Sequence, residues 1–418
     1  MKKEYQCANY IESGFVDPPV REAMLIPWKQ YDHSDEDLSQ TEPDADYFYS
    51  GHITETLPKL ELLEHKRTEV GKIKVYSEYV YINEYLTADE FEIVDSENEA
   101  DVLWYLYHFK DYEELSVSSP NKFINQFPYE YVITVKDLLP IVARRCSTNN
   151  ISQFRDDLEC NPVWLPTTYN MKTELHKLVA NYKKREKMNL DNNWICKPFN
   201  LARGMDTYIT DNLNFLCRLP LTGPKIAQKY IDNPVLFARP DCGLVKFDIR
   251  YVIILKSAEP TEAYVYNNFF LRFANKPFVL NNFDDYEQHF TVMNYNENAP
   301  LYRLLCEEFI LEWSKQYGDH DWQEIEKSIM TIFSELLTAA TCKTPPFSIA
   351  KSPQSRALYA ADVMLSWNPS KTYIEPKLLE VNWMPDCRRA CEYYPDFYND
   401  IFSVMFLDKN VDSIKRIV

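Results

Sequence analysis

The sequence predicts an α/β protein in which two or three lobes surround a shared cleft. A chain of 418 residues is too long for one simple hydrophobic core, so it should divide into several lobes. Apolar, strand-like runs alternate with amphipathic, helix-like segments along its length. Hydrophobic residues make up 45% of the chain and aromatic residues 15%, against only 7 glycines. This composition is typical of a densely packed globular protein and makes extensive disorder improbable.

The charge and the cysteines limit the classes of partner and compartment. A net charge of −18 argues against a broad basic surface, so we expect neither a nucleic acid nor a membrane as a partner. No apolar stretch reaches the roughly 18–20 residues of a membrane span, and the first residues lack the apolar core of a signal peptide. The ten cysteines form no CxxC pairs and should be reduced, mostly buried thiols. The closest pair, Cys387 and Cys391, leaves a metal or redox site as the alternative.

The N-terminal third predicts a small α/β lobe behind a polar segment. Residues 1–70 contain the acidic stretch 32–46, which we interpret as an exposed linker. Strands are expected at 72–76 and within 100–109, because both runs are apolar and bounded by polar residues. Residues 121–145 then close this lobe with a loop and a helical segment.

The remainder of the chain predicts alternating strands and helices. The helix expected over 173–188 ends in a basic cluster, where cations suit the helix dipole. That cluster is Lys183, Lys184, Arg185 and Lys187. The other expected elements are strand, loop and strand over 194–210, a strand at the end of 235–257, helices over 303–317 and 322–340, and a last strand pair at 359–367 and 374–382.

Polar residues interrupt several of the apolar strands. Glu380 and Asn382 are two residues apart in LLEVN, so they should project from the same face of their strand. An unpaired charge in an apolar site is strongly penalised, and such residues should therefore compensate one another. The others of this kind are Lys197, Lys246, Asp248, Arg250 and Asp362.

These residue types suit a metal-chelated polyphosphate. Two lysines and an arginine provide point charges and a flat, two-pronged contact for phosphate oxygens. Asp362, Glu380 and Asn382 provide the hard oxygen ligands that Mg²⁺ prefers. The alternative remains open that a single Asp or Glu here is a salt-bridge partner, and that Lys246 and Arg250 form a solvated strand face. No GxGxxG or P-loop fingerprint is present.

Several motifs resemble, in order and spacing, the tubulin–tyrosine ligase family, and one group within it most closely. The resemblance covers about residues 70–418 and implies an ATP-grasp fold. It rests on KP at 197–198, QKYIDNPVLF at 228–237, KFDIR at 246–250, Asp362, LLEVNWMP at 378–385 and NQFPYEYVITVKDLL at 125–139.

The resemblance also implies a domain organisation. The ligase module would span 71–418, with an N-terminal lobe at 71–145, a central lobe at 146–235 and a C-terminal lobe at 236–418. In the most similar group a SET-like domain precedes the module, and residues 1–70 are too few for a complete one, so they would be at most its remnant.

The resemblance further implies roles for individual residues. ATP would lie between the central and C-terminal lobes and phosphorylate a carboxylate, and an amine would then attack the acyl phosphate to form an amide. The implied residues are Lys197, Lys246 and Asp248 at the nucleotide, the backbone of Gln228, Lys229, Tyr230 and Ile231 at the adenine, Arg250 and Arg272 at the transferred phosphate, and Asp362, Glu380 and Asn382 at Mg²⁺.

Three positions depart from the family pattern. Asp206 replaces the second glycine of the loop that covers the phosphates and should repel a triphosphate, although Gly204 is kept. Asn268 and Phe269 replace a glutamate–glycine pair before Arg272. A threonine–asparagine pair is spread out as Thr291 and Asn294.

Two functions remain open. The first is an ATP- and Mg²⁺-binding ligase that acts on tubulin, and the second is a catalytically silent nucleotide-binding regulator of tubulin or histone modification. We expect a monomer in the cytoplasm, associated with microtubules or centrosomes or partly nuclear. Because tubulin tails are rich in glutamate, the basic helix cluster or the pair Arg388 and Arg389 could contact them, unless these are only solvated surface charges.

Overall fold

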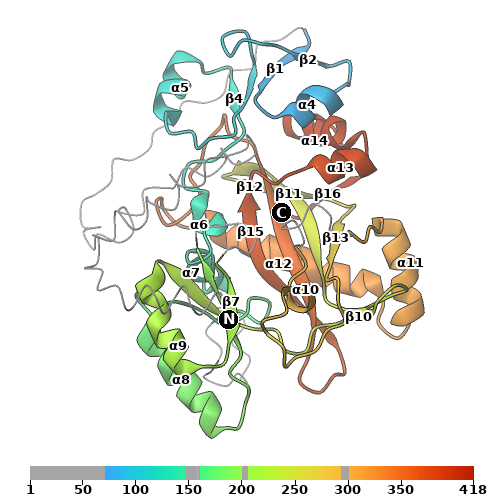
Figure 1. Cartoon of the computed structure of the whole chain (residues 1–418). Coiled ribbons are helices and arrows are strands. Elements are labelled where there is room, and N and C mark those ends of the chain that lie inside the picture. The colour runs from blue at the N-terminus through green and yellow to red at the C-terminus, as the bar shows by residue number, and fades with distance from the viewer. Residues whose placement is uncertain (1–70, 147–157, 159–160, 200–205, 293–300) are drawn as a thin grey trace.

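The structure is a computed structural model that describes residues 71–146, 158, 161–199, 206–292 and 301–418 (Figure 1). The predicted linker at 32–46 and the rest of residues 1–70 lie outside the described residues, as do Gly204 and Asn294. Within the described ranges, helices and strands alternate as the sequence predicts, and they build three main sheets.

The first sheet is parallel and lies at the N-terminal end of the described chain. Its four strands follow the order β2, β1, β3, β4, and the apolar side chains Val75, Val102 and Trp104 are buried against neighbouring helices. Its elements are β1 (Ile73–Ser77), α4 (Val80–Tyr85), β2 (Phe91–Ile93), β3 (Val102–Trp104), α5 (Tyr112–Ser118), β4 (Phe123–Ile124), α6 (Tyr131–Thr134) and α7 (Leu139–Ala143).

The second sheet is antiparallel and is covered by helix α8. Its strands follow the order β5, β8, β6, β7, and Leu178 of α8 is fully buried against it together with Trp194. The helix predicted over 173–188 is therefore confirmed. Its elements are β5 (Thr168–Asn170), α8 (Leu175–Lys187), β6 (Trp194–Pro198), β7 (Tyr208–Thr210), α9 (Leu213–Arg218), the short 3-10 helix η2 (Leu219–Thr222) and β8 (Lys225–Lys229).

The third sheet is the largest and is antiparallel. Its path runs β15, β14, β11, β12, β16, and β13 pairs with β11. Its elements, with those around it, are β9 (Phe237–Arg239), β10 (Gly243–Val245), β11 (Phe247–Ala258), β12 (Thr261–Tyr266), β13 (Phe270–Phe273), α10 (Tyr286–His289), α11 (Cys306–Gln316), α12 (Trp322–Thr341), β14 (Ala357–Trp367), β15 (Ile374–Trp383), α13 (Arg388–Tyr393), α14 (Phe397–Phe406) and β16 (Ile414–Arg416).

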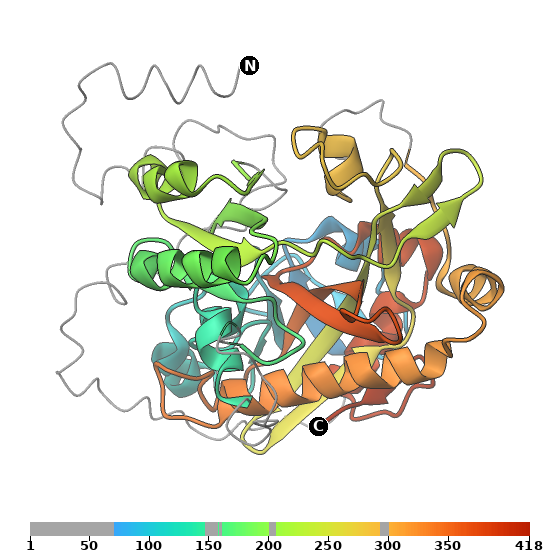
Figure 2. The ribbon, with the colours of Figure 1, turned by 90° about the horizontal axis from the view of Figure 1, so that it is seen from below.

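Both faces of the third sheet are used, in different ways. The helices α11 and α12 cover one face, and Phe309, Trp313, Ile329 and Phe333 pack there in the largest hydrophobic cluster (Figure 2). The opposite face is covered in part by α13 and α14. The remaining part of that face carries charged side chains and lies toward the second sheet.

Two expectations about the elements were wrong. The strand pair β14 and β15 is not the last, because β16 follows it and adds to the outer edge of β12. Arg185 is not a free surface charge of the helix cluster, since its side chain is only 11% exposed and pairs with Asp191 at 3.0 Å. Lys183, by contrast, is exposed and pairs with Glu186 on the same helix.

Membrane spans, thiols and metal-binding groups can be searched for in the described residues. No helix in these ranges is both long and apolar enough to cross a membrane. Cys387 and Cys391 are buried free thiols, as expected, whereas Cys217 and Cys342 are exposed. Nowhere in the described part do three or more His, Cys, Asp or Glu side chains form a group that could hold a metal.

Candidate functional site

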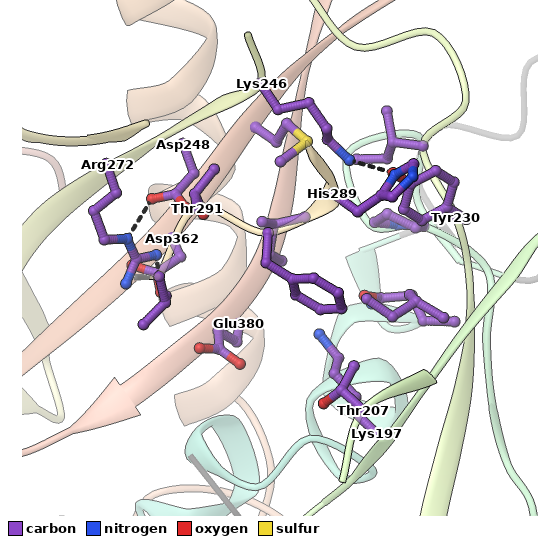
Figure 3. A pocket seen from close by; sticks show the side chains of 18 of the residues that line it. Lys197, Thr207, Tyr230, Lys246, Asp248, Arg272, His289, Thr291, Asp362 and Glu380 are labelled. Atoms are coloured by element: carbon purple, nitrogen blue, oxygen red, sulfur yellow. Dashed lines mark hydrogen bonds and ion pairs between the residues drawn. The ribbon is translucent and has the colours of Figure 1, made fainter. Parts of the chain in front are cut away.

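A pocket lies between the second and third sheets and brings most of the predicted residues together (Figure 3). Arg250 and Asn382 do not line it, but both contact Asp362, which does. The predicted residues that line it are Lys197, Gln228, Lys229, Tyr230, Ile231, Lys246, Asp248, Arg272, Asp362 and Glu380.

Strand register in the third sheet brings the charged side chains together. Arg250 on β11 lies opposite Asp362 on β14, and Asp362 in turn lies opposite Glu380 on β15. On the other side of β11, Asp248 lies opposite Arg272 of β13. Cross-strand neighbours of this kind are close enough for their side chains to interact. Residues more than a hundred positions apart in the chain, such as Arg250 and Asp362, therefore meet as neighbours in the sheet.

The arginines and aspartates form a closed ion-pair network. Arg250 binds Asp362 through two contacts, Nε to Oδ1 at 2.8 Å and Nη2 to Oδ2 at 2.9 Å. Arg272 bridges the two acids, with 2.8 Å from Nη2 to Asp362 Oδ2 and 2.7 Å from Nε to Asp248 Oδ1. The hydroxyl of Thr291 also donates to Asp248. Burial alone would raise the pKa of Asp362, but the two arginines lower it below its ordinary value.

Among the three predicted magnesium ligands, Asn382 lies within hydrogen-bonding distance of both acids. Asn382 Nδ2 lies 3.3 Å from Glu380 Oε1 and 3.3 Å from Asp362 Oδ2, so Glu380 and Asn382 do share one face of β15. Two carboxylates and an amide carbonyl are a suitable donor set for Mg²⁺. By donor chemistry the residues therefore fit the ion, although both oxygens of Asp362 also contact arginine.

The two predicted phosphate lysines differ from the arginines in having no acidic partner. Among the described residues, neither Lys197 nor Lys246 forms an ion pair. Lys246 donates to the hydroxyl of Tyr230 at 2.8 Å, and burial lowers its pKa to about 7. Burial also lowers the pKa of Lys197, although Glu380 opposes that effect. Figure 3 shows the ammonium group of Lys197 directed into the pocket and that of Lys246 directed at Tyr230.

An aromatic group lines the pocket around the predicted adenine segment. Tyr230 accepts the Lys246 hydrogen bond and also lies 2.8 Å from His289 Nδ1. Burial and the nearby Lys246 charge lower the pKa of His289 to about 4, so this ring is neutral near pH 7. Phe283 packs edge-on against Tyr230 at 5.9 Å between ring centroids.

The other polar side chains of the adenine segment turn toward their own neighbours. Gln228 donates to the Thr168 hydroxyl at 3.1 Å, and Lys229 lies 2.8 Å from Asp232. Neither side chain is therefore free to select a ligand. This arrangement is compatible with the expectation that the backbone of this segment, rather than its side chains, contacts the adenine.

The departures from the family pattern have structural partners. From the sequence we expected Asp206 to repel a phosphate. In the structure it pairs with the buried Lys225, which neutralises its carboxylate. Phe269 lies on the face covered by α11 and α12 and packs on Tyr251 and Trp322 at 5.3 and 5.1 Å. It therefore stabilises the core instead of lining the pocket. Thr291 remains at the pocket.

Sequence reasoning missed several residues of the pocket. Lys136, in the turn between α6 and α7, lines it and lies 3.5 Å from Glu380. Burial would raise the pKa of Glu380, but Lys136 and Lys197 lower it below its ordinary value. The signal for Lys136 was available, because this lysine interrupts the apolar run VITVKDLLPIV just as Asp362 interrupts its strand. Thr207 and His289 gave no such signal.

Comparison with known proteins identifies relatives whose names refer to tubulin modification. The chain is 43% identical over 403 residues to the human tubulin–tyrosine ligase-like protein 12, covering 95% of this chain and 61% of the relative. It is 40% identical over 407 residues to the protein of that name from Caenorhabditis elegans, covering 94% and 59%. It is also 27% identical over 331 residues to human tubulin polyglutamylase TTLL5, covering 73% and 23%.

These matches define the family and the fold. The chain spans about three fifths of the length of the first two relatives. The model of the tubulin-tyrosine ligase family, whose fold is ATP-grasp-like, matches residues 115–416. The predicted ATP-grasp fold and the similarity to one group of the family are both confirmed. The chain belongs to the tubulin–tyrosine ligase family.

Proposed function

We propose that this protein binds ATP with Mg²⁺ in the pocket and acts on tubulin as an ATP-dependent ligase that joins an amino acid to a protein carboxylate. Family members are generally ATP-dependent. The observation that carries the proposal is the pairing pattern of the pocket. Among the described residues, Lys197 and Lys246 have no acidic partner, although they line the same pocket as the carboxylates of Asp248, Asp362 and Glu380. A polyphosphate that is bound to Mg²⁺ would compensate the lysines through its phosphates and the carboxylates through the metal ion.

The proposed roles follow from this arrangement. Lys197 and Lys246 bind phosphate oxygens, and Asp362, Glu380 and Asn382 hold Mg²⁺, which neutralises phosphate charge when bound. Arg250 and Arg272 orient the acids that face the ion, and Arg272 lies at the pocket surface, where it contacts the transferred phosphate. Catalysis in such a site is mainly positioning and charge stabilisation, which explains why no highly reactive nucleophile is needed.

The choice of tubulin as partner rests on the relatives. Their names refer to a tubulin–tyrosine ligase-like protein and to a tubulin polyglutamylase. Histone is the alternative protein partner. A monomer in the cytoplasm, associated with microtubules or centrosomes, remains our expectation, with a nuclear fraction as the alternative.

A second function is favoured by two specific observations. Asp206 occupies a glycine position of the phosphate loop and is paired with Lys225, and both oxygens of Asp362 contact arginines. A protein of this design could bind nucleotide and regulate tubulin or histone modification without ligating anything.

One experiment with the full chain separates these functions. A fluorescent ATP analogue is titrated with Mg²⁺, and labelled tyrosine, glutamate or glycine is offered together with purified tubulin and ATP. Label in tubulin identifies the ligase and the amino acid that it adds. Nucleotide binding and co-sedimentation with tubulin, without label, identify the regulator. Absence of nucleotide binding, or binding that Lys197→Met does not weaken, contradicts both.

A further inference from the structure

A second group of arginines lies beside the pocket and has no place in the proposed nucleotide site. Arg388 and Arg389 begin α13, the next element after the strand that carries Glu380 and Asn382. Arg303 precedes α11 and lies 4.0 Å from Glu392 of α13. Cations concentrated at one place require an explanation in a chain with a net charge of −18.

The packing of α13 sets Arg389 near the phosphate end of the pocket. Tyr393 of this helix packs against Phe270 of β13, with 6.4 Å between the ring centroids. Arg389 is four residues before Tyr393, so the two side chains lie on the same face of the helix. Phe270 and Arg272 are two residues apart on β13 and share a face of the sheet. Arg389 therefore lies on the side of α13 that faces the strand carrying Arg272.

The acids near this group are already engaged. Glu392 lies 3.2 Å from Arg388 and is shared with Arg303. Asp386 accepts hydrogen bonds from the backbone N–H of Arg388 and from the Tyr79 hydroxyl, at 3.0 and 3.1 Å. In the described part of the chain, Arg389 has no ion pair and no hydrogen bond.

This situation is electrostatically unfavourable for Arg389. Its side chain is half-buried, and burial lowers its pKa. Tyr393 opposes this effect, whereas the charges of Arg303 and Arg272 lower the pKa further. A partly buried cation without a partner destabilises the fold, and its charge is normally compensated by an anion.

We propose that Arg389, with Arg303 beside it, binds a carboxylate of the substrate next to the phosphate end of the pocket. The proposal rests on the proposed function, because it supplies the substrate contact that the nucleotide site lacks. A guanidinium group matches the planar geometry of a carboxylate through two parallel hydrogen bonds. The carboxylate belongs either to an acidic peptide or to the amino acid that is to be joined. Both sources share this chemistry.

The test compares two arginine variants in the full chain. Arg389→Gln removes the proposed contact, whereas Arg218→Gln makes the same charge change at an exposed arginine at the end of α9. Binding of a fluorescent glutamate-rich peptide is measured by anisotropy, and binding of free glutamate and of free tyrosine by calorimetry, each with and without an ATP analogue. We expect Arg389→Gln to lower the affinity for one of these ligands at least about tenfold, because it removes a charged hydrogen bond. Arg389→Lys should restore part of the affinity, and Arg218→Gln should change it less than about twofold.

The outcomes are distinct from one another. Weaker peptide binding assigns the carboxylate to the peptide, and weaker binding of the free amino acid alone assigns it to the ligated residue. Equal binding by both Gln variants, or no carboxylate binding by the unmodified chain, overturns the proposal. ATP-analogue binding and the melting temperature are followed in parallel. Failure of the analogue to bind, with the Arg389 effect intact, refutes the proposed nucleotide site and not this contact.

Discussion

Two groups of charged side chains in the pocket are compensated in opposite ways. On the side of the third sheet, Arg250, Arg272, Asp248 and Asp362 pair within one network, at contacts of 2.7–2.9 Å. The second group consists of Lys197, on β6 across the pocket, and Lys246, directly before β11; both are desolvated and have no acidic partner in the described chain. The arginines and aspartates of this network compensate one another without a ligand. Burial of the two lysines becomes favourable only when an anion binds, and this difference supports the assignment of the lysines as phosphate ligands.

Substitution of Asp362 should have the largest effect, because it breaks the ion-pair network of the two arginines. Asp362→Asn leaves the arginines Arg250 and Arg272 without their shared carboxylate, and breaking a buried pair in this way costs about 3–5 kcal/mol. Urea unfolding should show this loss. The matched control Glu186→Gln breaks a pair in which both side chains are more than half exposed, with an expected loss of about 0–1 kcal/mol. Similar losses in both variants would contradict the network.

Substitution of Lys246 should separate binding from stability. Lys246→Met keeps the length of the side chain and removes a buried ammonium group, so the free energy of unfolding should change by less than about 1 kcal/mol. Affinity for the ATP analogue should nevertheless fall at least about tenfold. Lys187→Met, at the exposed end of α8, should leave that affinity unchanged. A large loss of stability would show that the charge of Lys246 is already compensated in the protein without a ligand.

The pH dependence of the free energy of unfolding gives a finer test of the buried Lys246. The pKa of Lys246 in the folded protein, about 7, is below its ordinary value of 10.5. The unfolded chain therefore binds more protons between these values, and the contribution of Lys246 to the free energy of unfolding becomes more favourable as the pH rises from about 7 to 10.5.

Nucleotide binding should reverse this effect, because phosphate favours the charged lysine. At pH 8 we expect uptake of up to about one proton per nucleotide, measured by calorimetry in buffers of different ionisation enthalpy. Lys246→Met should reduce the uptake. Equal uptake by both proteins would rule out Lys246 as its source.

Substitution of Asp206 should have the smallest effect. Asp206 has a φ of +51° and pairs with Lys225, whose side chain is 1% exposed. Asp206→Asn tolerates this φ but removes the charge, and should lower the free energy of unfolding by about 1 kcal/mol. Asp206→Gly relieves the backbone and should recover part of that loss. Nucleotide affinity should change by no more than about twofold in both variants, since Lys225 already neutralises the carboxylate. A large gain in affinity would show that Asp206 does repel phosphate.

Much of the site could be predicted from local patterns. Alternation along a strand predicted that Glu380 and Asn382 share a face, and the hydrogen bond between them agrees. Polar residues that interrupt apolar runs identified Lys197, Lys246 and Asp362, which all line the pocket. The same criterion would have found Lys136. His289 could not be found in this way, because a histidine in a polar segment has no pattern that distinguishes it.

The sequence by itself determined which residue types face one way on each strand, because side-chain direction along a strand depends only on local geometry. It also determined the family, through motifs that survive at their spacing. Only the tertiary structure decided which acid meets which cation. Arg272 bridges Asp248 and Asp362, Asp206 meets Lys225, and Arg389 faces the strand of Arg272 because of strand register and helix packing between distant segments. Such pairings depend on contacts that no local pattern encodes.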